Sequence, residues 1–249
     1  ESIGQLAAGI AHEINTPIQF VGDNTRFLKD SFRELQTALE SLRNGTATSD
    51  SLDAAEIDFL SSEIPRAIEQ TLEGVSRVST IVRAMKEFAH PGSDKKQAVD
   101  INRLIESTSI VSTNEWKYAA EMSLVLDRNL PLVPCHAAEL NQAVLNLIVN
   151  AAHAIAEKSG AKKGKITVST SLDGDYGVIS VADTGAGIPD NVAPKVFDPF
   201  FTTKPIGKGT GQGLSMTRSI IVERHGGMIG FRTVPGEGTT FNIHLPLTA

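Results

Sequence analysis

An unbroken heptad pattern of apolar residues constrains the fold of this chain more than any other feature. From residue 14 to residue 42 these positions are separated alternately by about four and three residues. The members of this seam are Ile14, Ile18, Val21, Thr25, Leu28, Phe32, Leu35, Leu39 and Leu42, with Thr25 as the polar step. The spacing predicts one long helix with an apolar seam, which ends at Asn44-Gly45.

A second helical pattern lies between residues 57 and 85 and stops at His90-Pro91-Gly92. Pro65 lies inside it and predicts a kink, or a break that would make Leu52 to Ile64 a separate short helix. Two such helices predict a hairpin whose apolar stripes are too wide to be covered within the hairpin. We therefore expect a second copy of the chain to complete a dimeric four-helix bundle. A plain dimerisation coiled coil is the simpler alternative.

Composition limits the class of protein. With 249 residues, 41% of them hydrophobic and 21% charged, the chain is typical of soluble globular proteins. Its net charge of −6 argues against nucleic-acid binding as the main function. Cys135 has no partner for an internal disulfide, which favours a cytoplasmic setting. No apolar run reaches the ~20 residues of a membrane span, and the helical pattern already present at Glu1 suggests a piece of a longer protein.

After a polar linker at residues 92–97 the pattern changes to mixed helices and strands. Helices are expected over residues 101–113, 136–156 and 214–224, and strands over 122–126, 165–171, 178–182, 228–234 and 240–245. This order predicts an α/β sandwich, in which a layer of helices covers a mixed sheet. The chain is therefore expected to contain two domains, residues 1–91 and residues 95–249.

The first helix carries a histidine in an unusual context. His12 lies one residue past Ala11, where the seam projects backward, so its imidazole is expected to face solvent. Pro17 would free the carbonyl of Glu13 and costs about 3 kcal/mol in a helix interior. A neutral imidazole can act as a nucleophile if Glu13 takes the proton from its other nitrogen, and Thr16 could hold a water. A solvated surface histidine is the alternative.

Three segments of the second half predict a nucleotide site. The first has Asn146, Asn150 and His153 on one face of the long helix. Amide oxygens suit Mg²⁺, which completes its shell with water and phosphate oxygens. Polar groups on an otherwise apolar helix face need partners, and a bound metal–nucleotide would supply them.

The second segment is Asp183-Thr184-Gly185-Ala186-Gly187-Ile188-Pro189, at the end of an apolar strand. The Asp183 carboxylate could accept a hydrogen bond from the exocyclic amine of adenine. Gly185 and Gly187 could let the backbone approach a flat base closely. Taken alone, this pattern is also a common turn motif.

The third segment is glycine-rich, from Gly207 to Gly213, and leads into the helix that begins near Leu214. A helix start offers free N–H groups to phosphates, although the spacing fits neither a Walker loop nor a Rossmann loop. Lys195, Lys204 and Lys208 could add positive charge, or each could be an ordinary solvated surface lysine.

These motifs resemble those of a known family. His12-Glu13-Ile14-Asn15-Thr16-Pro17 resembles the phosphoacceptor box of two-component sensor histidine kinases. The three later segments, with Phe197-Asp198-Pro199-Phe200-Phe201, resemble the ATP-binding domain shared by these kinases, gyrase, mismatch-repair ATPases and a heat-shock chaperone. The resemblance implies that His12 takes the γ-phosphoryl group of ATP and that Glu13 is its base. It also implies that Thr16 orients water when the regulator's phosphoryl group is hydrolysed, and that the phosphoryl group passes to an aspartate of a response-regulator receiver domain.

The same resemblance assigns the nucleotide-site residues. Asn150 would bind Mg²⁺, Asn146 and His153 would contact phosphates, Asp183 would read adenine, and Lys195 would assist phosphoryl transfer. The full nucleotide-binding set is Asn146, Asn150, His153, Asp183, Gly185, Gly187, Ile188, Lys204, Lys208, Gly209, Gly211, Gly213, Leu214 and Thr240.

Departures from the family pattern separate the possible activities. Asn146 occupies the position where the related ATPases carry a glutamate that activates water, which favours a kinase over an ATPase. Residues 200–212 would be the ATP lid, where Gln212 replaces a commoner leucine, and His153 stands where lysine or arginine is frequent. Two alternatives stay open: an ATP-hydrolysing switch that uses the hairpin only to dimerise, and an inactive scaffold that binds ATP or a regulator.

Overall fold

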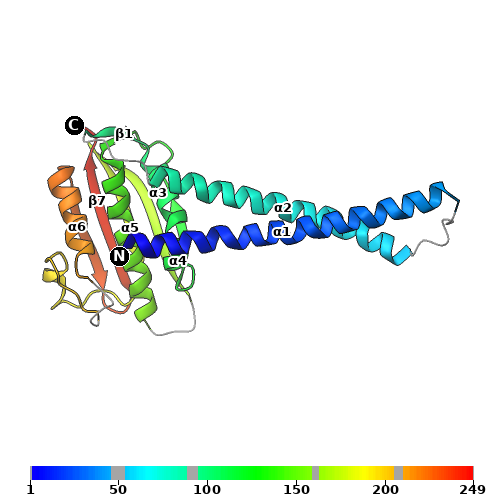
Figure 1. Cartoon of the computed structure of the whole chain (residues 1–249). Helices are drawn as coiled ribbons and strands as arrows, with labels where there is room; N and C mark the ends of the chain where they lie inside the picture. Colours follow the sequence, from blue (N-terminus) through cyan, green and yellow to red (C-terminus); the bar gives the residue numbers. More distant parts are fainter. Residues whose placement is uncertain (1, 46–53, 89–94, 159–162, 205–209, 249) are drawn as a thin grey trace. The chain divides into compact units, whose positions relative to one another are not determined.

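The computed structural model describes residues 2–45, 54–88, 95–158, 163–204 and 210–248 (Figure 1). The chain divides into two compact units, Glu1–Val82 and Arg83–Ala249. The division lies within the second helix. Most of the boundary predicted from the sequence, between residues 91 and 95, lies outside the described residues, so those domain limits stay a prediction.

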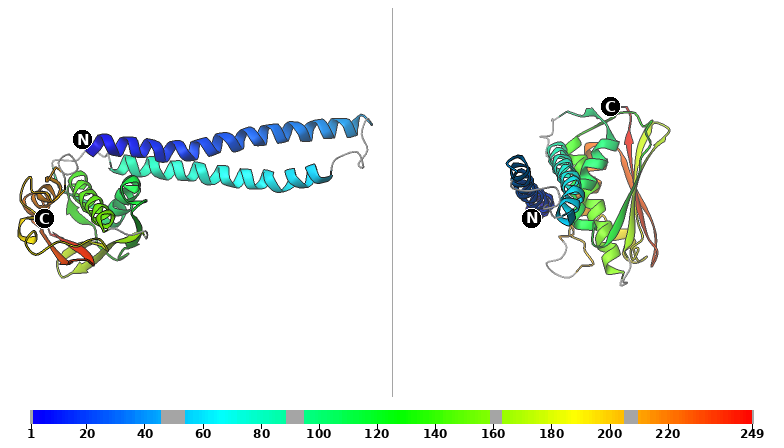
Figure 2. Two further views of the ribbon diagram at one scale, coloured as in Figure 1. Left: turned by 90° about the horizontal axis from the view of Figure 1, so that it is seen from below. Right: turned by 90° about the vertical axis from the view of Figure 1, so that its right-hand side faces the viewer.

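The first unit is a helical hairpin. Helix α1 (Ser2–Arg43) and helix α2 (Ala54–Phe88) run side by side in opposite directions (Figures 1 and 2). Gly45 has a φ of 70°, which suits a glycine just past a helix end. Helix α2 continues through Pro65, so the alternative of a separate short helix before this proline is wrong. The predicted helical hairpin is confirmed.

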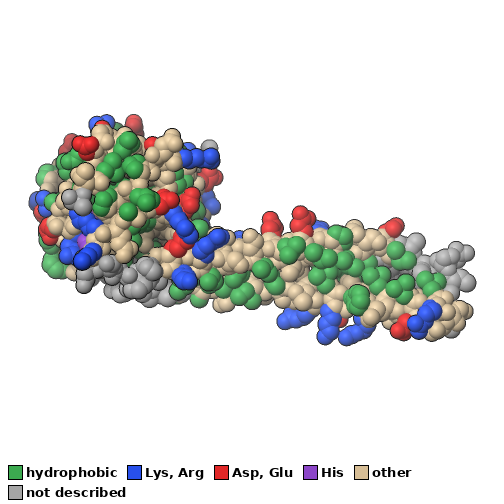
Figure 3. All heavy atoms as spheres, turned by 90° about the horizontal axis from the view of Figure 1, so that it is seen from above, with side chains coloured by type: hydrophobic (Ala, Val, Ile, Leu, Met, Phe, Trp, Pro, Cys, Tyr) green, Lys and Arg blue, Asp and Glu red, His purple; other side chains and the backbone are tan. Residues whose placement is uncertain are grey.

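The residues of the heptad seam of α1 form two alternating sets with different surroundings. Ile14, Val21, Leu28 and Leu35 are partly buried in the hairpin. Ile18, Phe32 and Leu39, the alternate members, are 50%, 61% and 64% exposed. Helix α2 likewise exposes Ile68, Leu72 and Val75. Figure 3 shows hydrophobic side chains along one surface of the hairpin. A single hairpin therefore covers only part of its apolar surface.

The second unit contains a five-stranded mixed sheet in the order β2-β4-β5-β7-β6. The strands are β2 (Ala120–Val125), β4 (Gly164–Asp173), β5 (Tyr176–Asp183), β6 (Met228–Val234) and β7 (Gly238–Pro246). Strand β2 pairs with β4 in parallel, and the other pairs are antiparallel. A small sheet of β1 (Gln97–Val99) and β3 (Val133–Cys135) was not predicted.

Helices cover one face of the sheet (Figure 2). They are α3 (Ile101–Val111), α4 (Thr113–Trp116), α5 (Ala137–Glu157) and α6 (Gly213–Ser219), which continues into a π-helical turn, η3 (Ile220–Arg224). The core between the layers contains Ile148 of α5, Ile166 of β4, Ile179 of β5 and Ile243 of β7, all fully buried. The residues of β7 alternate between buried and partly exposed, as expected for a strand with one covered face. The predicted helix-covered mixed sheet is confirmed.

None of the helices, in the parts that the structure describes, is long and apolar enough to cross a membrane.

Candidate phosphoacceptor and nucleotide sites

The first candidate site is the helical turn around His12. The side chain of His12 is exposed, and within the described part of the chain its imidazole has no hydrogen-bond partner. The Thr16 hydroxyl donates a hydrogen bond to the His12 carbonyl at 3.0 Å. Pro17 has no N–H to offer the carbonyl of Glu13. The imidazole is thus accessible to a reactant from outside the hairpin.

Glu13 contacts the opposite helix. Its Oε2 accepts a hydrogen bond from Nη2 of Arg77 on α2, at 3.0 Å. The Glu13 side chain is only 12% exposed, whereas that of Arg77 is 62% exposed. Sequence reasoning missed Arg77, because a contact between residues 64 positions apart leaves no local pattern.

The second candidate site begins on α5. The side-chain amide of Asn146 donates to the Gly213 carbonyl at 3.1 Å and accepts from Gln142 at 2.9 Å. Asn150 lies one turn further along α5 and is partly buried. A Cβ built on Gly213 would lie 3.8 Å from Cγ of Asn146 and 3.9 Å from Nδ2 of Asn150. The start of α6 therefore lies directly beside both predicted amide ligands.

His153 and Lys204 form a close pair at the same helix. Nζ of Lys204 lies 2.7 Å from Nδ1 of His153. Burial lowers the pKa of His153, and the charge of Lys204 lowers it further. Burial also lowers the pKa of Lys204, against the opposing effect of Glu157. A neutral imidazole can accept a hydrogen bond from the Lys204 ammonium, and an arriving phosphate would find a cation here.

Asp183 is the last residue of strand β5 and is partly buried. Its Oδ1 accepts the Gly185 N–H at 2.7 Å. Burial raises the pKa of Asp183, while the backbone N–H groups of Gly185 and Thr239 and the charge of Lys158 act in the opposite direction. The carboxylate is therefore held by the backbone in a fixed orientation.

The structure does not bring Thr240 to this carboxylate. Thr240 pairs with Ala182 across the β5–β7 ladder and shares its sheet face, whereas Asp183 points to the other face. Thr239 is the residue of β7 whose N–H reaches Asp183. The role of Thr240 as a nucleotide ligand stays a prediction.

The glycines of the second segment are needed for packing. A Cβ on Gly185 would lie 2.6 Å from the carbonyl carbon of Ala154 on α5. Gly187 has a φ of +71°, and a Cβ there would lie 2.4 Å from the Val234 carbonyl oxygen. Ile188 is partly buried, and its N–H donates to the Thr233 hydroxyl at 2.8 Å. These contacts hold the Asp183 turn against α5 and the β6–β7 hairpin.

The structure describes only the ends of the predicted ATP lid, residues 200–204 and 210–212. Gly211, with a φ of +65°, approaches the backbone of Phe200, where a Cβ would lie 2.4 Å from the carbonyl carbon. Phe200 itself has a φ of 65°, a strained conformation for a residue with a side chain. Lys208 and Gly209 lie outside the described residues. Lys195, in the short 3₁₀ helix η2 (Ala193–Lys195), is exposed, and Leu214 is in the first turn of α6.

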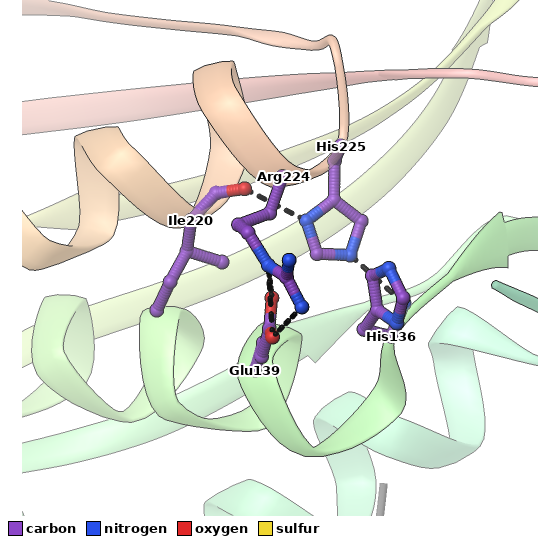
Figure 4. A network of polar contacts seen from close by, with 5 residues as sticks. All are labelled: His136, Glu139, Ile220, Arg224 and His225. Atoms are coloured by element: carbon purple, nitrogen blue, oxygen red, sulfur yellow. Dashed lines mark hydrogen bonds and ion pairs between the residues drawn. The ribbon is translucent and has the colours of Figure 1, made fainter. Parts of the chain in front are cut away.

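A network that the sequence did not reveal ties α6 to the start of α5 (Figure 4). His225 is 1% exposed, and its Nε2 accepts the backbone N–H of His136 at 2.9 Å. Its Nδ1 donates to the Ile220 carbonyl at 2.8 Å, which fixes the neutral tautomer. Arg224 and Glu139 form an ion pair at 2.9 Å beside it. The π-helical turn lets consecutive residues 224 and 225 both reach α5.

The comparisons with known proteins agree with this geometry. Residues 135–249 match the family described as histidine kinase-, DNA gyrase B-, and HSP90-like ATPase. Over 248 residues, 99% of this chain, the sequence is 30% identical to the signal transduction histidine-protein kinase AtoS of Escherichia coli. Nearly the whole chain is thus similar to sensor histidine kinases. The family resemblance predicted from the sequence is confirmed.

Two other relatives are similar to the chain over nearly its whole length. The chain is 32% identical over 99% of its length to the sensor histidine kinase ZraS of Klebsiella oxytoca. It is 30% identical over 98% of its length to the sensor protein FixL of Bradyrhizobium diazoefficiens. It spans only 35% of AtoS, 44% of FixL and 46% of ZraS, which are much longer proteins.

Solved histidine kinase structures share the fold. The catalytic domain of histidine kinase ThkA is 28% identical, with a TM-score of 0.54, over 61% of this chain and 96% of that chain. ThkA in complex with response regulator protein TrrA matches 99% of this chain and 62% of that chain, at a TM-score of 0.51 and 24% identity. At that identity the whole-chain match supports the fold alone.

Proposed function

We propose that this chain is the catalytic core of a sensor histidine kinase that transfers the γ-phosphoryl group of ATP to the imidazole of His12. The observation that carries the proposal is the exposed His12, adjacent to Glu13, on the same chain as an ATPase-family domain. In this reaction a bond forms between an imidazole nitrogen and the γ-phosphorus, and the bond to the β-phosphate oxygen breaks. The imidazole proton passes to Glu13, and ADP leaves.

The residues of the second unit have separate roles in this proposal. Asp183 accepts a hydrogen bond from the exocyclic amine of adenine, His153 and Lys204 contact the phosphates, and Lys195 assists transfer from its exposed position. Asn146 is already tied to Gly213 and Gln142, so it positions the start of α6 as well as the phosphates.

Mg²⁺ fits the chemistry of this site. The Asn150 amide is partly buried beside Gly213, and amide oxygens are hard ligands for this ion. Among the described residues no cluster of three or more His, Cys, Asp or Glu side chains could hold a metal by itself. A Mg²⁺ ion here would therefore be shared between Asn150 and the nucleotide, and it would neutralise charge on the phosphates.

A homodimer is part of the proposal. The exposed half of the α1 seam, with Ile18, Phe32 and Leu39, would pack against a second hairpin in a four-helix bundle. Phe32→Asp should shift the chain toward monomer in sedimentation, because it places a charge in that interface. Thr37→Asp, at an exposed position about 140° around the helix from Phe32, should leave the dimer intact. A monomeric wild type would contradict the dimer.

The phosphoryl group of phosphohistidine would pass to an aspartate of a response-regulator receiver domain, and Thr16 would orient water when that regulator is dephosphorylated. The Thr16 hydroxyl donates its proton to the His12 carbonyl, so its oxygen could hold such a water by accepting a hydrogen bond from it. ATP is a cytoplasmic metabolite, so we place the reaction in the cytoplasm.

The rival function is an ATP-hydrolysing switch. An amide cannot act as a general base, and Asn146 holds the position that would need one. Incubation with γ-labelled ATP and Mg²⁺ separates the two functions. The kinase should incorporate acid-labile, base-stable label, and Asn150→Ala should lose both the label and Mg²⁺-dependent nucleotide binding. Steady ADP release without label on the protein would favour the switch.

A further inference from the structure

We propose that Arg77 is a positioning residue for phosphoryl transfer, which holds the Glu13 carboxylate in place to take the proton of His12. The inference rests on the proposed function. Arg77 would touch neither His12 nor the nucleotide. It would act through Glu13. In this arrangement the base, Glu13, activates the nucleophile, His12, and Arg77 orients the base.

The environment of the pair first suggests this role. The Glu13 carboxylate is sheltered in the hairpin at 12% exposure, and Arg77 Nη2 lies 3.0 Å from its Oε2. A sheltered carboxylate needs a hydrogen-bonding partner, and Arg77 supplies one from the other helix. Three other ion pairs of the hairpin join residues three positions apart on one helix: Arg26–Asp23, Arg33–Asp30 and Arg66–Glu63. The Arg77 pair differs because it joins α2 to the turn that carries His12.

The stability of the hairpin does not explain the pair. An ion pair whose arginine is mostly in solvent contributes only about 0–1 kcal/mol to folding. Its larger consequence is geometric, because it restricts where a carboxylate next to the nucleophile can point.

The backbone packing around the pair sets this geometry. Gly74 lies one turn before Arg77 on α2, and a Cβ built there would lie 2.7 Å from Cγ2 of Val21 and 3.4 Å from the Pro17 carbonyl oxygen. The two helices therefore approach each other closely at Gly74. Because they run in opposite directions, this contact brings Arg77 level with Glu13.

The proline adds a reason for the anchor. Pro17 cannot donate to the Glu13 carbonyl, so this turn of α1 lacks one helical hydrogen bond. A base on such a turn has fewer constraints from its own helix, and Arg77 provides one from the neighbouring helix. Arg77 binds Oε2 of the carboxylate that we assign to receive the imidazole proton as the N–P bond forms.

The test uses kinetics of autophosphorylation with the whole chain. Arg77→Gln removes the charge, Arg77→Lys keeps it, and Arg66→Gln is the matched control, since Arg66 is 67% exposed on the same helix. Arg77→Gln should lower kcat roughly ten- to a hundredfold, the range for a misplaced catalytic group, with KM for ATP within about twofold. Arg77→Lys should stay within about threefold of wild type, and Arg66→Gln should be unchanged.

A purely structural role for Arg77 would change helicity or dimerisation, so circular dichroism and sedimentation accompany each variant. If Arg77→Gln folds poorly, Arg77→Leu is the second neutral variant, because an apolar side chain can pack on the hairpin. A folded neutral variant with wild-type kcat would overturn the proposal. An Arg77→Lys variant as slow as Arg77→Gln would also overturn it. A wild type without acid-labile label would instead refute the proposed function.

Discussion

Acidification should weaken the second unit through His225, and replacing this residue should remove part of that effect. In the folded protein both ring nitrogens are committed, because Nε2 accepts from the His136 N–H and Nδ1 donates to the Ile220 carbonyl. Burial lowers the pKa of His225 below its ordinary 6.5, with further lowering from His136 and Lys96. The hydrogen bond to Ile220 and the charge of Glu139 oppose this change.

The sign of the effect follows from proton binding. Below about pH 6.5 the unfolded chain takes up a proton at this histidine, and the folded protein does so only at lower pH. The stabilisation is therefore complete above pH 6.5 and is lost as the pH falls toward the lowered pKa. One histidine contributes at most about 1.4 kcal/mol of unfolding free energy per pH unit in that window.

His225→Phe is the informative substitution, because phenylalanine is close in size and cannot ionise. It removes the hydrogen bonds that the imidazole makes with the His136 N–H and the Ile220 carbonyl. At roughly 1–3 kcal/mol each, unfolding at pH 7.5 should need roughly 2–6 kcal/mol less free energy. The free energy lost between pH 6.5 and 5.5 should be smaller than in wild type. His153 also has a lowered pKa, so His153→Gln serves as the comparison that changes a different histidine.

Urea unfolding followed by Trp116 fluorescence measures these free energies. Trp116 is the one tryptophan of the chain and lies partly buried in the second unit, so its emission reports that unit. If His225→Phe keeps the full pH dependence of wild type between pH 6.5 and 5.5, the assignment of the effect to this residue is wrong.

Two further predictions concern the nucleotide-binding unit. Gly187→Ala should destabilise it by more than about 2 kcal/mol in the same urea assay, because the φ is unfavourable for alanine and the new Cβ would clash with the Val234 carbonyl. Gly174→Ala is the control, with a φ of +55° but open space around the new Cβ, and it should cost only about 1 kcal/mol. Equal losses in the two variants would contradict the packing argument. Nucleotide phosphates should raise the pKa of His153, so ADP should bind more tightly as the pH falls from about 7 to 6, with proton uptake in calorimetry that His153→Gln lacks. Identical proton uptake in both proteins would exclude His153 as the source.

The fold could be predicted from the sequence because its elements have strong local patterns. The seam from Ile14 to Leu42 predicts α1, and the alternation over residues 240–245 predicts β7, so these elements lie where expected. Where two threonines are adjacent in a strand, the local sequence does not show which of them lies next to a given residue of the neighbouring strand. That the N–H of Thr239 reaches Asp183 was therefore not predicted, since the register of β7 comes from pairing across the sheet.

Contacts between distant segments account for the rest of what was missed. Arg77 meets Glu13 across 64 residues, and His225 meets His136 across 89. Neither pair has a spacing that a single sequence reveals, although His225 before two glycines at a helix end is a recognisable local signal. The close contacts of Gly185 with Ala154 and of Gly187 with Val234 were not predicted either, because these partners lie on other elements.

The central claim is that His12 becomes phosphorylated by ATP bound to the second unit. Mapping the labelled residue by mass spectrometry under alkaline conditions, in wild type and His12→Gln, tests it most directly. We expect a single phosphohistidine at position 12 in wild type and none in His12→Gln, with equal nucleotide affinity for both proteins. A phosphoryl group on another residue, or label that persists in His12→Gln, would contradict the account.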